Sequence, residues 1–315
     1  MATTFAFVFP GQGSQSVGML DAWGDHPVVA ETLREASDAL GEDVGALIHS
    51  GPKEALALTT NTQPVMLVAG VAAWRVWRAE GGALPAAVAG HSLGEYSALV
   101  ASGVLTLAQA APLVRLRAAA MQEAVPVGAG AMAAILGLDS AKVIAGCAEA
   151  AAALGGQEVV EAVNFNDPIQ TVIAGTKAGV DKACEVLKAA GAKRALPLPV
   201  SAPFHSSLMK PAAEKLKAAL AATPLAAPQI PVVNNVDVAV VQDAEAIRDA
   251  LYRQAFGPVR WVECVQALKG RGITRIVECG PGKVLAGLTK RIDAELVGAA
   301  LYDPATLAEA KELLA

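Results

Sequence analysis

The clearest chemical signal in the sequence is a serine that lies between two glycines, in the segment Gly90-His91-Ser92-Leu93-Gly94. The segment follows an apolar run at 86–89, which predicts a short strand, and precedes a helical pattern at 93–101. The pattern G-x-S-x-G also occurs in ordinary glycine-rich turns, but in a strand–turn–helix context it is typical of a nucleophile elbow. Such a turn lifts the serine oxygen onto a helix N-terminus, where the Leu93 N–H and the helix dipole can stabilise an oxyanion. Ser92 is therefore predicted to be the nucleophile of an acyl-transfer enzyme.

A serine nucleophile needs a general base, and the chain contains four histidines. His91 adjoins the serine, and neighbouring residues in so tight a turn point apart, while His26 and His49 lie in polar, surface-like segments. His205 lies in the loop SAPFHSS at 201–207, between a predicted strand and a predicted helix, where catalytic groups concentrate. Elimination therefore predicts His205 as the base.

The elements around the serine alternate between strand and helix. Short apolar runs predict strands at 5–9 and 86–89, and a longer apolar pattern predicts a helix at 64–79 that opens at its proline. Thr106 and Gln109 form a T-x-x-Q capping box that opens a further helix. This alternation predicts a parallel sheet that is covered on both faces.

The middle of the chain follows a different pattern. Residues 127–200 carry the order βαββαβ, which is typical of a ferredoxin-like subdomain. The predicted elements are, in order, 128–138, 139–153, 159–165, 171–174, 176–190 and 195–200. The α/β pattern then resumes with a helix at 207–221, a strand at 232–233, helices to about 269, a strand at 273–278 and a last helix after Gly280-Pro281-Gly282. We therefore expect a large α/β domain, 1–126 and 201–315, with a mainly parallel sheet, and an inserted smaller subdomain, 127–200.

Composition narrows the class of protein. Hydrophobic residues make up 54% of the chain and charged residues 17%, so a large core can be buried, and the formal net charge of -5 gives no reason to expect nucleic acid or a membrane as a partner. The longest uncharged stretch, 96–114, is interrupted by polar residues and a proline, which argues against a spanning helix. The four cysteines form no C-x-x-C pair and have no histidine at metal-ligand spacing, so we expect no metal site and a reducing, cytoplasmic location.

Seven motifs, in family order, resemble the malonyl-CoA:acyl carrier protein transacylases of fatty acid synthesis. They cover nearly the whole chain and are FVFPGQGSQ (7–15), GHSLGEYSAL (90–99), RLRAAAMQ (115–122), NDPIQTVIAG (166–175), SAPFHSSLM (201–209), PVRW (258–261) and ECGPGKVLAGL (278–288). The resemblance implies an α/β-hydrolase-like large domain. It also implies that the protein transfers a malonyl group from malonyl-CoA to the phosphopantetheine thiol of holo acyl carrier protein through a malonyl-serine intermediate, with no metal or other cofactor.

The resemblance assigns roles to further residues. The serine would be acylated, and the predicted base would also act as general acid. The backbone N–H of Gln12 would complete an oxyanion hole beside that of Leu93. The backbone carbonyl of Gln254 would orient the base, giving a dyad in which a carbonyl replaces the usual acid. Asn164 would lie in a strand that borders the cleft.

Arg117 is implied as the group that binds the malonyl carboxylate. A free carboxylate in a dry acyl pocket needs a guanidinium, whose planar fork gives two charge-assisted hydrogen bonds, and an acetyl group would leave that arginine buried and unpaired. Arg115 lies two residues away and faces nearly the opposite side of the helix, whereas Met121 shares the face of Arg117 and would line the same pocket. Phe204, just before the base, would crowd an extra methyl group and so favours malonyl over methylmalonyl.

An acidic carrier protein requires a local basic face on a chain whose own net charge is negative. The segment 176–194 carries five basic side chains against two acidic ones. They are Lys177, Lys182, Lys188, Lys193 and Arg194, against Asp181 and Glu185. We hypothesise that this helix and its exit contribute to docking, with an ordinary solvated helix face as the alternative. Nothing in the sequence demands more than a monomer.

Three other functions fit parts of the sequence. A serine hydrolase of the thioesterase or patatin type is disfavoured, because no histidine follows His205 and the chain contains no Asp-Gly pair. A close relative that loads a carrier in polyketide synthesis or malonate decarboxylation fits the same motifs. A non-catalytic CoA-binding scaffold would not need Gln12, Ser92, Arg117 and His205 together.

Overall fold

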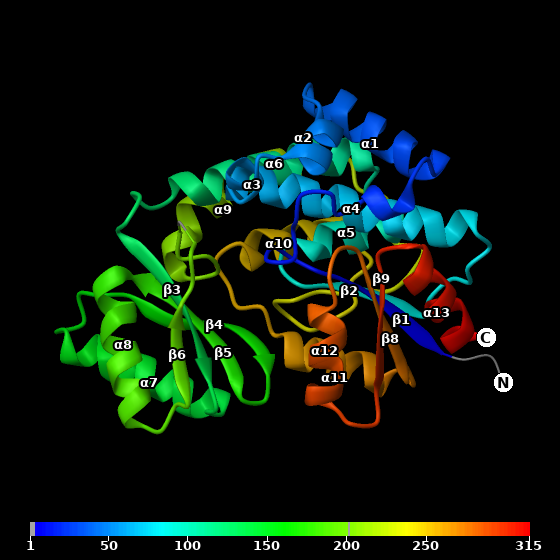
Figure 1. Ribbon diagram of the computed structural model, residues 1–315. Coiled ribbons are helices and arrows are strands. Elements are labelled where there is room, and N and C mark those ends of the chain that lie inside the picture. The colour runs from blue at the N-terminus through cyan, green and yellow to red at the C-terminus, as the bar shows by residue number, and fades with distance from the viewer. Residues whose placement is uncertain (1–3, 201) are drawn as a thin grey trace.

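The computed structural model describes residues 4–200 and 202–315 and contains two sheets that lie side by side (Figure 1). Met1 to Thr3 and Ser201, where the second part of the predicted large domain begins, lie outside the described residues. The larger sheet has five strands in the order β7-β2-β1-β8-β9, and all four strand pairs are parallel. Its strands are β1 (Phe5–Phe9), β2 (Ala87–Gly90), β7 (Val232–Val233), β8 (Arg275–Cys279) and β9 (Val297–Leu301).

Helices cover both faces of the larger sheet, and the alternation of side chains along β1 shows why. Phe5, Phe7 and Phe9 enter a core that includes α4, α5 and α13, whereas Ala6 and Val8 pack against α11 and α12. The Phe7 ring meets Trp74 and Trp77 edge-on, at centroid distances of 5.7 and 5.3 Å. The predicted parallel sheet with two covered faces is therefore confirmed.

The remaining α-helices, apart from α7 (Ser140–Ala153) and α8 (Lys177–Ala189), which pack on the smaller sheet, surround the larger sheet or lie beside it. They are α1 (Pro27–Leu40), α2 (Val44–Ser50), α3 (Lys53–Leu56), α4 (Thr59–Ala79), α5 (Gly94–Ala101), α6 (Leu107–Glu123), α9 (Lys210–Ala222), α10 (Ala244–Gln254), α11 (Trp261–Gly270), α12 (Val284–Ile292) and α13 (Pro304–Leu314). The capping box predicted at Thr106 and Gln109 is present at the start of α6.

The smaller sheet is antiparallel, with the order β4-β5-β3-β6. Its elements are β3 (Gly130–Leu136), α7 (Ser140–Ala153), β4 (Val160–Asp167), β5 (Gln170–Thr176), α8 (Lys177–Ala189) and β6 (Arg194–Pro197). Helices α7 and α8 pack on one face, at the outer left of Figure 1, through an apolar cluster that includes Ile135, Ile173 and Leu187. The predicted ferredoxin-like βαββαβ arrangement is confirmed.

Backbone hydrogen bonds join the edge of the smaller sheet to the larger unit. Phe165 N donates to Val259 O at 3.0 Å, and Val259 N donates to Val163 O at 2.8 Å. The edge strand β4 is thereby paired with the segment between α10 and α11. This pairing fixes the smaller sheet beside the carboxyl end of α10, where Gln254 lies.

Helix α4 begins at Thr59, five residues before the proline at which the sequence places its start. A proline inside a helix leaves the carbonyl four residues earlier without its usual donor. Here that carbonyl belongs to Thr60, and Arg115 Nη1 donates to it at 2.7 Å. A side chain from a distant helix thus replaces the lost bond, which a local sequence pattern does not reveal.

The chain continues past the helix that the sequence takes as the last one. After α12 it forms the edge strand β9 and the helix α13. The strand sequence VGAAL has little β preference, so its place at the sheet edge comes from packing. The start of α13 does carry a recognisable signal, since Asp303 caps the helix by accepting from Thr306 N and Pro304 occupies the first turn.

A buried carboxyl group ends strand β8. Glu278 is fully buried, and its Oε2 accepts a hydrogen bond from Ala286 N, at the start of α12, at 2.9 Å. Its Oε1 is buried without a hydrogen-bond partner among the described residues. Burial raises the pKa of Glu278 to about 7, because the low dielectric disfavours the charged form.

We predict that Glu278→Gln flattens the pH dependence of stability. Because the folded-state pKa lies above the ordinary glutamate value of 4.5, this group favours folding most below pH 4.5, and its contribution is lost as the pH rises towards about 7. Between pH 5 and pH 7 the loss amounts to about 2 kcal/mol, at about 1.4 kcal/mol per pKa unit. Denaturant unfolding at pH 5 and pH 7 measures it, with the exposed Glu149→Gln as control. Equal pH dependence in wild type and Glu278→Gln would contradict the prediction.

Candidate active site

Ser92 lies in the turn between β2 and α5, with its backbone in the left-handed region at φ 53°. The two glycines of the motif are required by close backbone approach. A Cβ at Gly90 would overlap the backbone of Gly94, and a Cβ at Gly94 would overlap the carbonyl of Phe9 in β1. The predicted strand–turn–helix context is confirmed, and it presents the serine at the N-terminus of α5.

Ser92 Oγ lies 2.6 Å from Nε2 of His205, and Nδ1 of the same ring lies 3.0 Å from the backbone oxygen of Gln254. A carbonyl oxygen only accepts, so Nδ1 carries the proton and Nε2 of the neutral ring accepts from the serine hydroxyl. The structure thus brings together the two residues of the expected dyad, Ser92 and His205, and the Gln254 carbonyl that orients the base. It also supplies the tautomer that a base for Ser92 needs.

The pKa of His205 is lowered to about 3. Burial is the largest cause, because His205 is 4% exposed, and the positive charge of Arg117 adds to it. The hydrogen bond to the Gln254 carbonyl acts in the opposite direction. The imidazole is therefore neutral, and able to accept a proton, over the whole physiological pH range.

Arg117 reaches the serine from helix α6. Its Nη2 donates to Ser92 Oγ at 3.2 Å and to Gln254 Oε1 at 3.0 Å, and its Nη1 donates to Gln63 Oε1 at 2.5 Å. The side chain is 2% exposed, and its guanidinium carbon lies 5.6 Å from the centroid of the Tyr96 ring. Arg117 Nε is buried and has no hydrogen-bond partner among the residues described, so this donor is available to a ligand.

Arg115 lies on a different side of α6, as the helical period predicts. It bonds Thr60 O and Asn61 Oδ1, each at 2.7 Å, and forms an ion pair with Glu42. Only Arg117 faces the serine. Met121 shares the face of Arg117, and both contact Gln63, whose Nε2 lies 3.9 Å from the Met121 sulfur.

Phe204 is 5% exposed and lies in an apolar cluster between the smaller sheet and helices α6 and α9. The cluster joins α6, the inner face of the smaller sheet and the loop that carries His205. Its members include Met121, Met132, Val163, Val172, Ala174 and Phe204. An acyl chain attached to Ser92 would therefore meet an apolar wall on one side and the Arg117 guanidinium on another.

The loop that carries Gln12 lies against the elbow. A Cβ at Gly11 would lie 2.8 Å from the carbonyl oxygen of His91, so the loop and the turn are in backbone contact. The Gln12 side chain accepts from Thr59 Oγ1 at 3.0 Å. Leu93 directly precedes α5, so its N–H belongs to the helix N-terminus. The use of the Gln12 and Leu93 N–H groups as an oxyanion hole stays a prediction.

Asn164 lies in β4, at the point where this strand meets Val259. Its Oδ1 is buried without a hydrogen-bond partner among the described residues. Two residues further along, Asn166 Oδ1 lies 2.8 Å from His91 Nε2, which ties the elbow to the smaller sheet. Asn164 is thus placed beside the site, and its role in binding stays a prediction.

Three residues that the sequence does not single out complete the site. Gln63 contacts Arg117, and Asn235 Oδ1 accepts from Ser92 N at 2.7 Å. Glu95, which is 2% exposed, accepts from Gln254 Nε2 at 3.0 Å. Glu95 does leave a signal in the sequence, since it is the last charge before the uncharged stretch 96–114. Gln63 and Asn235 leave none, because their contacts span 54 and 143 residues.

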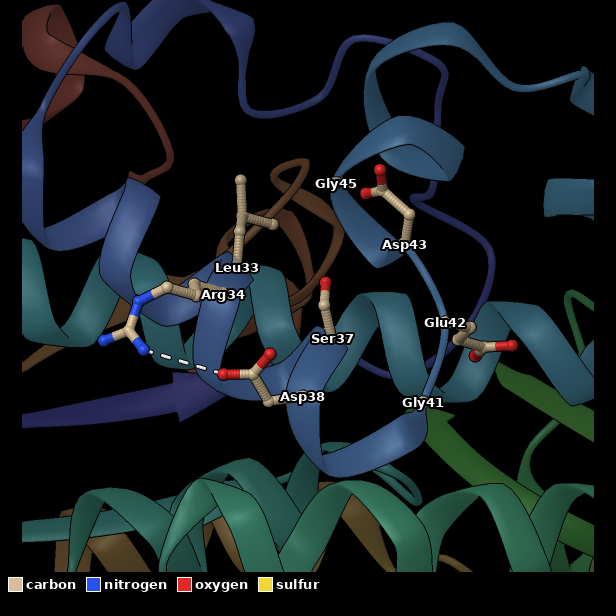
Figure 2. A pocket seen from close by; sticks show the side chains of 8 residues that line it. All are labelled: Leu33, Arg34, Ser37, Asp38, Gly41, Glu42, Asp43 and Gly45. Atoms are coloured by element: carbon tan, nitrogen blue, oxygen red, sulfur yellow. Dashed lines mark ion pairs between the residues drawn. The ribbon is translucent and has the colours of Figure 1, made fainter.

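Neither a surface hollow nor a cluster of metal-binding side chains gives a second site among the described residues. A surface hollow between α1 and α2 (Figure 2) is lined by Arg34, Asp38 and Asp43 among others, but Arg34 pairs with Asp38 and Asp43 caps α2. Within residues 4–200 and 202–315, no cluster of three or more His, Cys, Asp or Glu side chains is arranged to hold a metal ion. No helix in the same ranges has the length and apolar character needed to cross a membrane.

Sequence comparisons find close relatives. The chain matches the family model of the acyl transferase domain over residues 6–292. It is 56% identical over 309 residues to the malonyl CoA-acyl carrier protein transacylase of Salmonella typhimurium, with 98% of this chain and 99% of the relative covered. The protein of the same name from Bacillus subtilis is 45% identical over 303 residues, with 96% and 94% covered.

Solved structures share the fold. An acyl-carrier-protein S-malonyltransferase from Burkholderia pseudomallei is 67% identical, with a TM-score of 0.96 over 98% of this chain and 100% of that one. A malonyl-transacylase solved in complex with a type II polyketide synthase acyl-carrier protein is 54% identical, with a TM-score of 0.96 over 99% of this chain and 100% of that one.

The low pKa of His205 predicts a flat pH profile for the reactivity of Ser92. With a pKa of about 3, the ring is already neutral at pH 5, so the rate of modification by phenylmethylsulfonyl fluoride should change by less than about twofold between pH 5 and 8. An ordinary histidine with a pKa near 6.5 would lose roughly thirtyfold over that range. Inactivation rates at several pH values distinguish the two, and a midpoint near pH 6.5 would contradict the assigned environment.

Proposed function

Given that the chain belongs to the malonyl CoA-acyl carrier protein transacylase family of acyltransferases, we propose that Ser92 carries the malonyl group that this enzyme moves from malonyl-CoA to acyl carrier protein. The observation that supports this most is the buried guanidinium of Arg117, whose Nη2 lies 3.2 Å from Ser92 Oγ. A positive charge beside a serine nucleophile suits an acyl group with a free carboxylate at its far end.

In the first half-reaction, His205 Nε2 takes the proton from Ser92 Oγ as the oxygen attacks the thioester carbonyl carbon of malonyl-CoA. The N–H groups of Gln12 and Leu93 hold the oxyanion of the tetrahedral intermediate. The C–S bond then breaks, and the CoA sulfur leaves with the proton held by His205. The product is a malonyl ester of Ser92.

Arg117 selects the acyl group. Its Nε has no hydrogen-bond partner among the described residues, and a malonyl carboxylate would satisfy this donor together with an adjacent Nη group. An acetyl group has no charge to pair with the buried guanidinium. Phe204 and Met121, which belong to one apolar cluster, would contact the methylene of the malonyl group. Asn164 Oδ1, which is buried without a hydrogen-bond partner among the described residues, is a further candidate contact.

In the second half-reaction, the phosphopantetheine thiol of holo acyl carrier protein attacks the malonyl ester. His205 takes the thiol proton and returns it to Ser92 Oγ as the ester bond breaks, which restores the free enzyme. Acyl transfer changes no oxidation state, so neither half-reaction calls for a redox cofactor. We place the enzyme in fatty acid biosynthesis, acting as a monomer in the cytoplasm, where four free cysteines would persist.

A second acceptor is a carrier protein of polyketide synthesis. The observation that favours it is the 54% identity to a malonyl-transacylase that was solved with a type II polyketide synthase acyl-carrier protein. Transfer from malonyl-CoA to a fatty acid carrier and to a polyketide carrier, measured side by side, ranks the two acceptors. A hydrolase would instead release free malonate in the absence of any carrier.

Replacing the nucleophile tests the covalent intermediate. Incubation of the wild-type protein with malonyl-CoA should add one malonyl group, visible in the intact mass, and Ser92→Ala should show no adduct because Oγ is missing. Ser97→Ala, which removes a neighbouring buried serine of α5, serves as the control and should keep the adduct. An intact adduct in Ser92→Ala would overturn the assignment.

Two ion pairs in the segment 176–194 bear on the docking hypothesis. Lys177 pairs with Asp181 at 2.6 Å and Lys182 with Glu185 at 3.1 Å, so the net positive charge comes from the remaining basic residues. These are Lys188, Lys193 and Arg194, all exposed. Helix α8 packs on the face of the smaller sheet opposite to the Phe204 cluster. Docking there requires the phosphopantetheine arm to pass the edge of the sheet.

Charge reversal tests this surface. We expect the double variant Lys188→Glu, Lys193→Glu to raise KM for acyl carrier protein about tenfold, because it repels an acidic partner, while malonylation of the enzyme by malonyl-CoA stays unchanged. Lys53→Glu, an exposed reversal on α3, serves as the matched control. Equal effects on the CoA and carrier half-reactions, or none on either, would count against docking through α8.

A further inference from the structure

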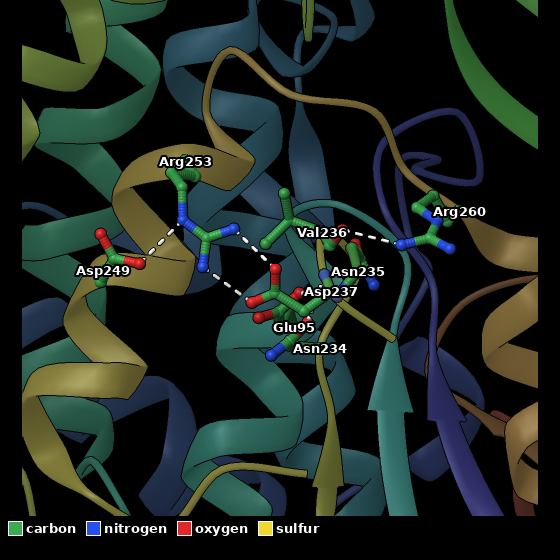
Figure 3. A network of polar contacts seen from close by, with 8 residues as sticks. All are labelled: Glu95, Asn234, Asn235, Val236, Asp237, Asp249, Arg253 and Arg260. Carbon is green, nitrogen blue, oxygen red and sulfur yellow. Dashed lines mark hydrogen bonds and ion pairs between the residues drawn. The ribbon is translucent and has the colours of Figure 1, made fainter. Parts of the chain in front are cut away.

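A buried carboxylate lies behind the nucleophile. Glu95 is in the first turn of α5, three residues after Ser92, and is 2% exposed. A buried charge is unfavourable unless hydrogen bonds compensate for lost water. Glu95 Oε2 accepts two such bonds, from Asn235 N at 2.9 Å and from Gln254 Nε2 at 3.0 Å. Figure 3 shows Glu95 beside the loop that contains Asn235.

The two partners of Glu95 hold the backbone of Ser92 from opposite sides. Ser92 N donates to Asn235 Oδ1 at 2.7 Å, and Ser92 O accepts from Gln254 Nε2 at 2.9 Å. Asn235 also donates through Nδ2 to Gly90 O at 2.7 Å. The side chains of Asn235 and Gln254 thus bind the left-handed backbone of Ser92 at its N–H and at its carbonyl. Both residues also donate a hydrogen bond to Glu95.

Gln254 also connects Glu95 to Arg117. The Gln254 amide nitrogen faces two acceptors, Glu95 Oε2 and Ser92 O, so its oxygen must face the other way. There Oε1 accepts from Arg117 Nη2 at 3.0 Å. A flipped amide would put oxygen against two acceptors and NH₂ against a guanidinium, so Glu95 helps to fix the orientation that Arg117 needs.

We propose that Glu95 is a positioning residue, which holds Asn235 and Gln254 around Ser92 and, through the Gln254 amide, keeps Arg117 directed at the serine hydroxyl. The claim rests on the proposed malonyl transfer, because the selectivity it explains is that of Arg117. Burial raises the pKa of Glu95 to about 7, while the bonds from Gln254 and Asn235 and the charge of Arg117 each lower it. These three neighbours offset part of the effect of burial, which still leaves the pKa of Glu95 above its ordinary value.

Glu95→Gln tests the role with little change of shape. A neutral amide accepts more weakly than a carboxylate and can itself donate to the Gln254 oxygen, so the amide of Gln254 loses its fixed orientation. We expect kcat/KM for malonyl-CoA to fall about tenfold more than kcat/KM for acetyl-CoA. Modification of Ser92 by phenylmethylsulfonyl fluoride, which needs the dyad and not Arg117, should slow by about threefold or less. Glu149→Gln, on the exposed face of α7, should change none of these.

A purely structural role predicts a different result. In that case malonyl transfer, acetyl transfer and sulfonyl fluoride reactivity would fall together with the folded fraction, and the malonyl-to-acetyl ratio would stay at the wild-type value. An unchanged ratio in folded Glu95→Gln would overturn the proposal. Absence of malonyl transfer in the wild type would instead overturn the proposed function, so the two failures are distinguishable.

Gln254→Met gives an independent route, because it removes the amide and keeps the backbone carbonyl that faces His205. Gln254→Met should reproduce the loss of malonyl preference. Adding Glu95→Gln should lower the malonyl-to-acetyl ratio by less than about twofold further, because both changes act on the same Glu95–Gln254–Arg117 connection. If Glu95→Gln does not fold, the malonyl-to-acetyl ratio of Gln254→Met alone tests the connection through the amide. Additive losses in the double variant, or a wild-type ratio in Gln254→Met, would exclude the connection through the amide.

Discussion

The hydrogen bond between Ser92 Oγ and His205 Nε2 joins two residues that both hold left-handed backbone, at φ 53° and 66°. Such a conformation costs a residue with a side chain about 1–3 kcal/mol and persists only where the surroundings enforce it. At the serine, the enforcement comes from strand β2, from glycines that allow backbone to touch backbone, and from Asn235. The ring of His205 is oriented separately, by the hydrogen bond from Nδ1 to the Gln254 carbonyl.

The site also contains two ionisable side chains, Arg117 and Glu95, that are buried away from water. Arg117 and Glu95 are each 2% exposed, and Gln254 lies between them with one end of its amide bonded to each. Burying a guanidinium alone would be unfavourable, and a carboxylate held one amide away offsets part of that cost. The arrangement keeps the positive charge available to a ligand, because a direct ion pair would have occupied it.

The sequence was informative where chemistry and local geometry coincide. The elbow, the base, the carbonyl behind it and the choice of Arg117 over Arg115 follow from motifs and from the helical period. Gln63, Asn235 and the bond from Arg115 to Thr60 join segments far apart in the chain, and no local pattern encodes such pairs. The sequence pattern places the start of α4 at Pro64 instead of Thr59 for the same reason. The distant Arg115 donates to the Thr60 carbonyl that Pro64 leaves without a donor, so the helix can include the proline.

The pairing of β4 with Val259 has a consequence for synthesis of the chain. An edge strand with free N–H and C=O groups invites pairing with other chains. In the growing polypeptide, β4 is complete about 90 residues before Val259 is made, so its outer edge stays open while the ribosome adds the helices between them. Until that segment arrives, the nascent smaller sheet has an exposed template, and folding must finish before a neighbouring chain occupies it.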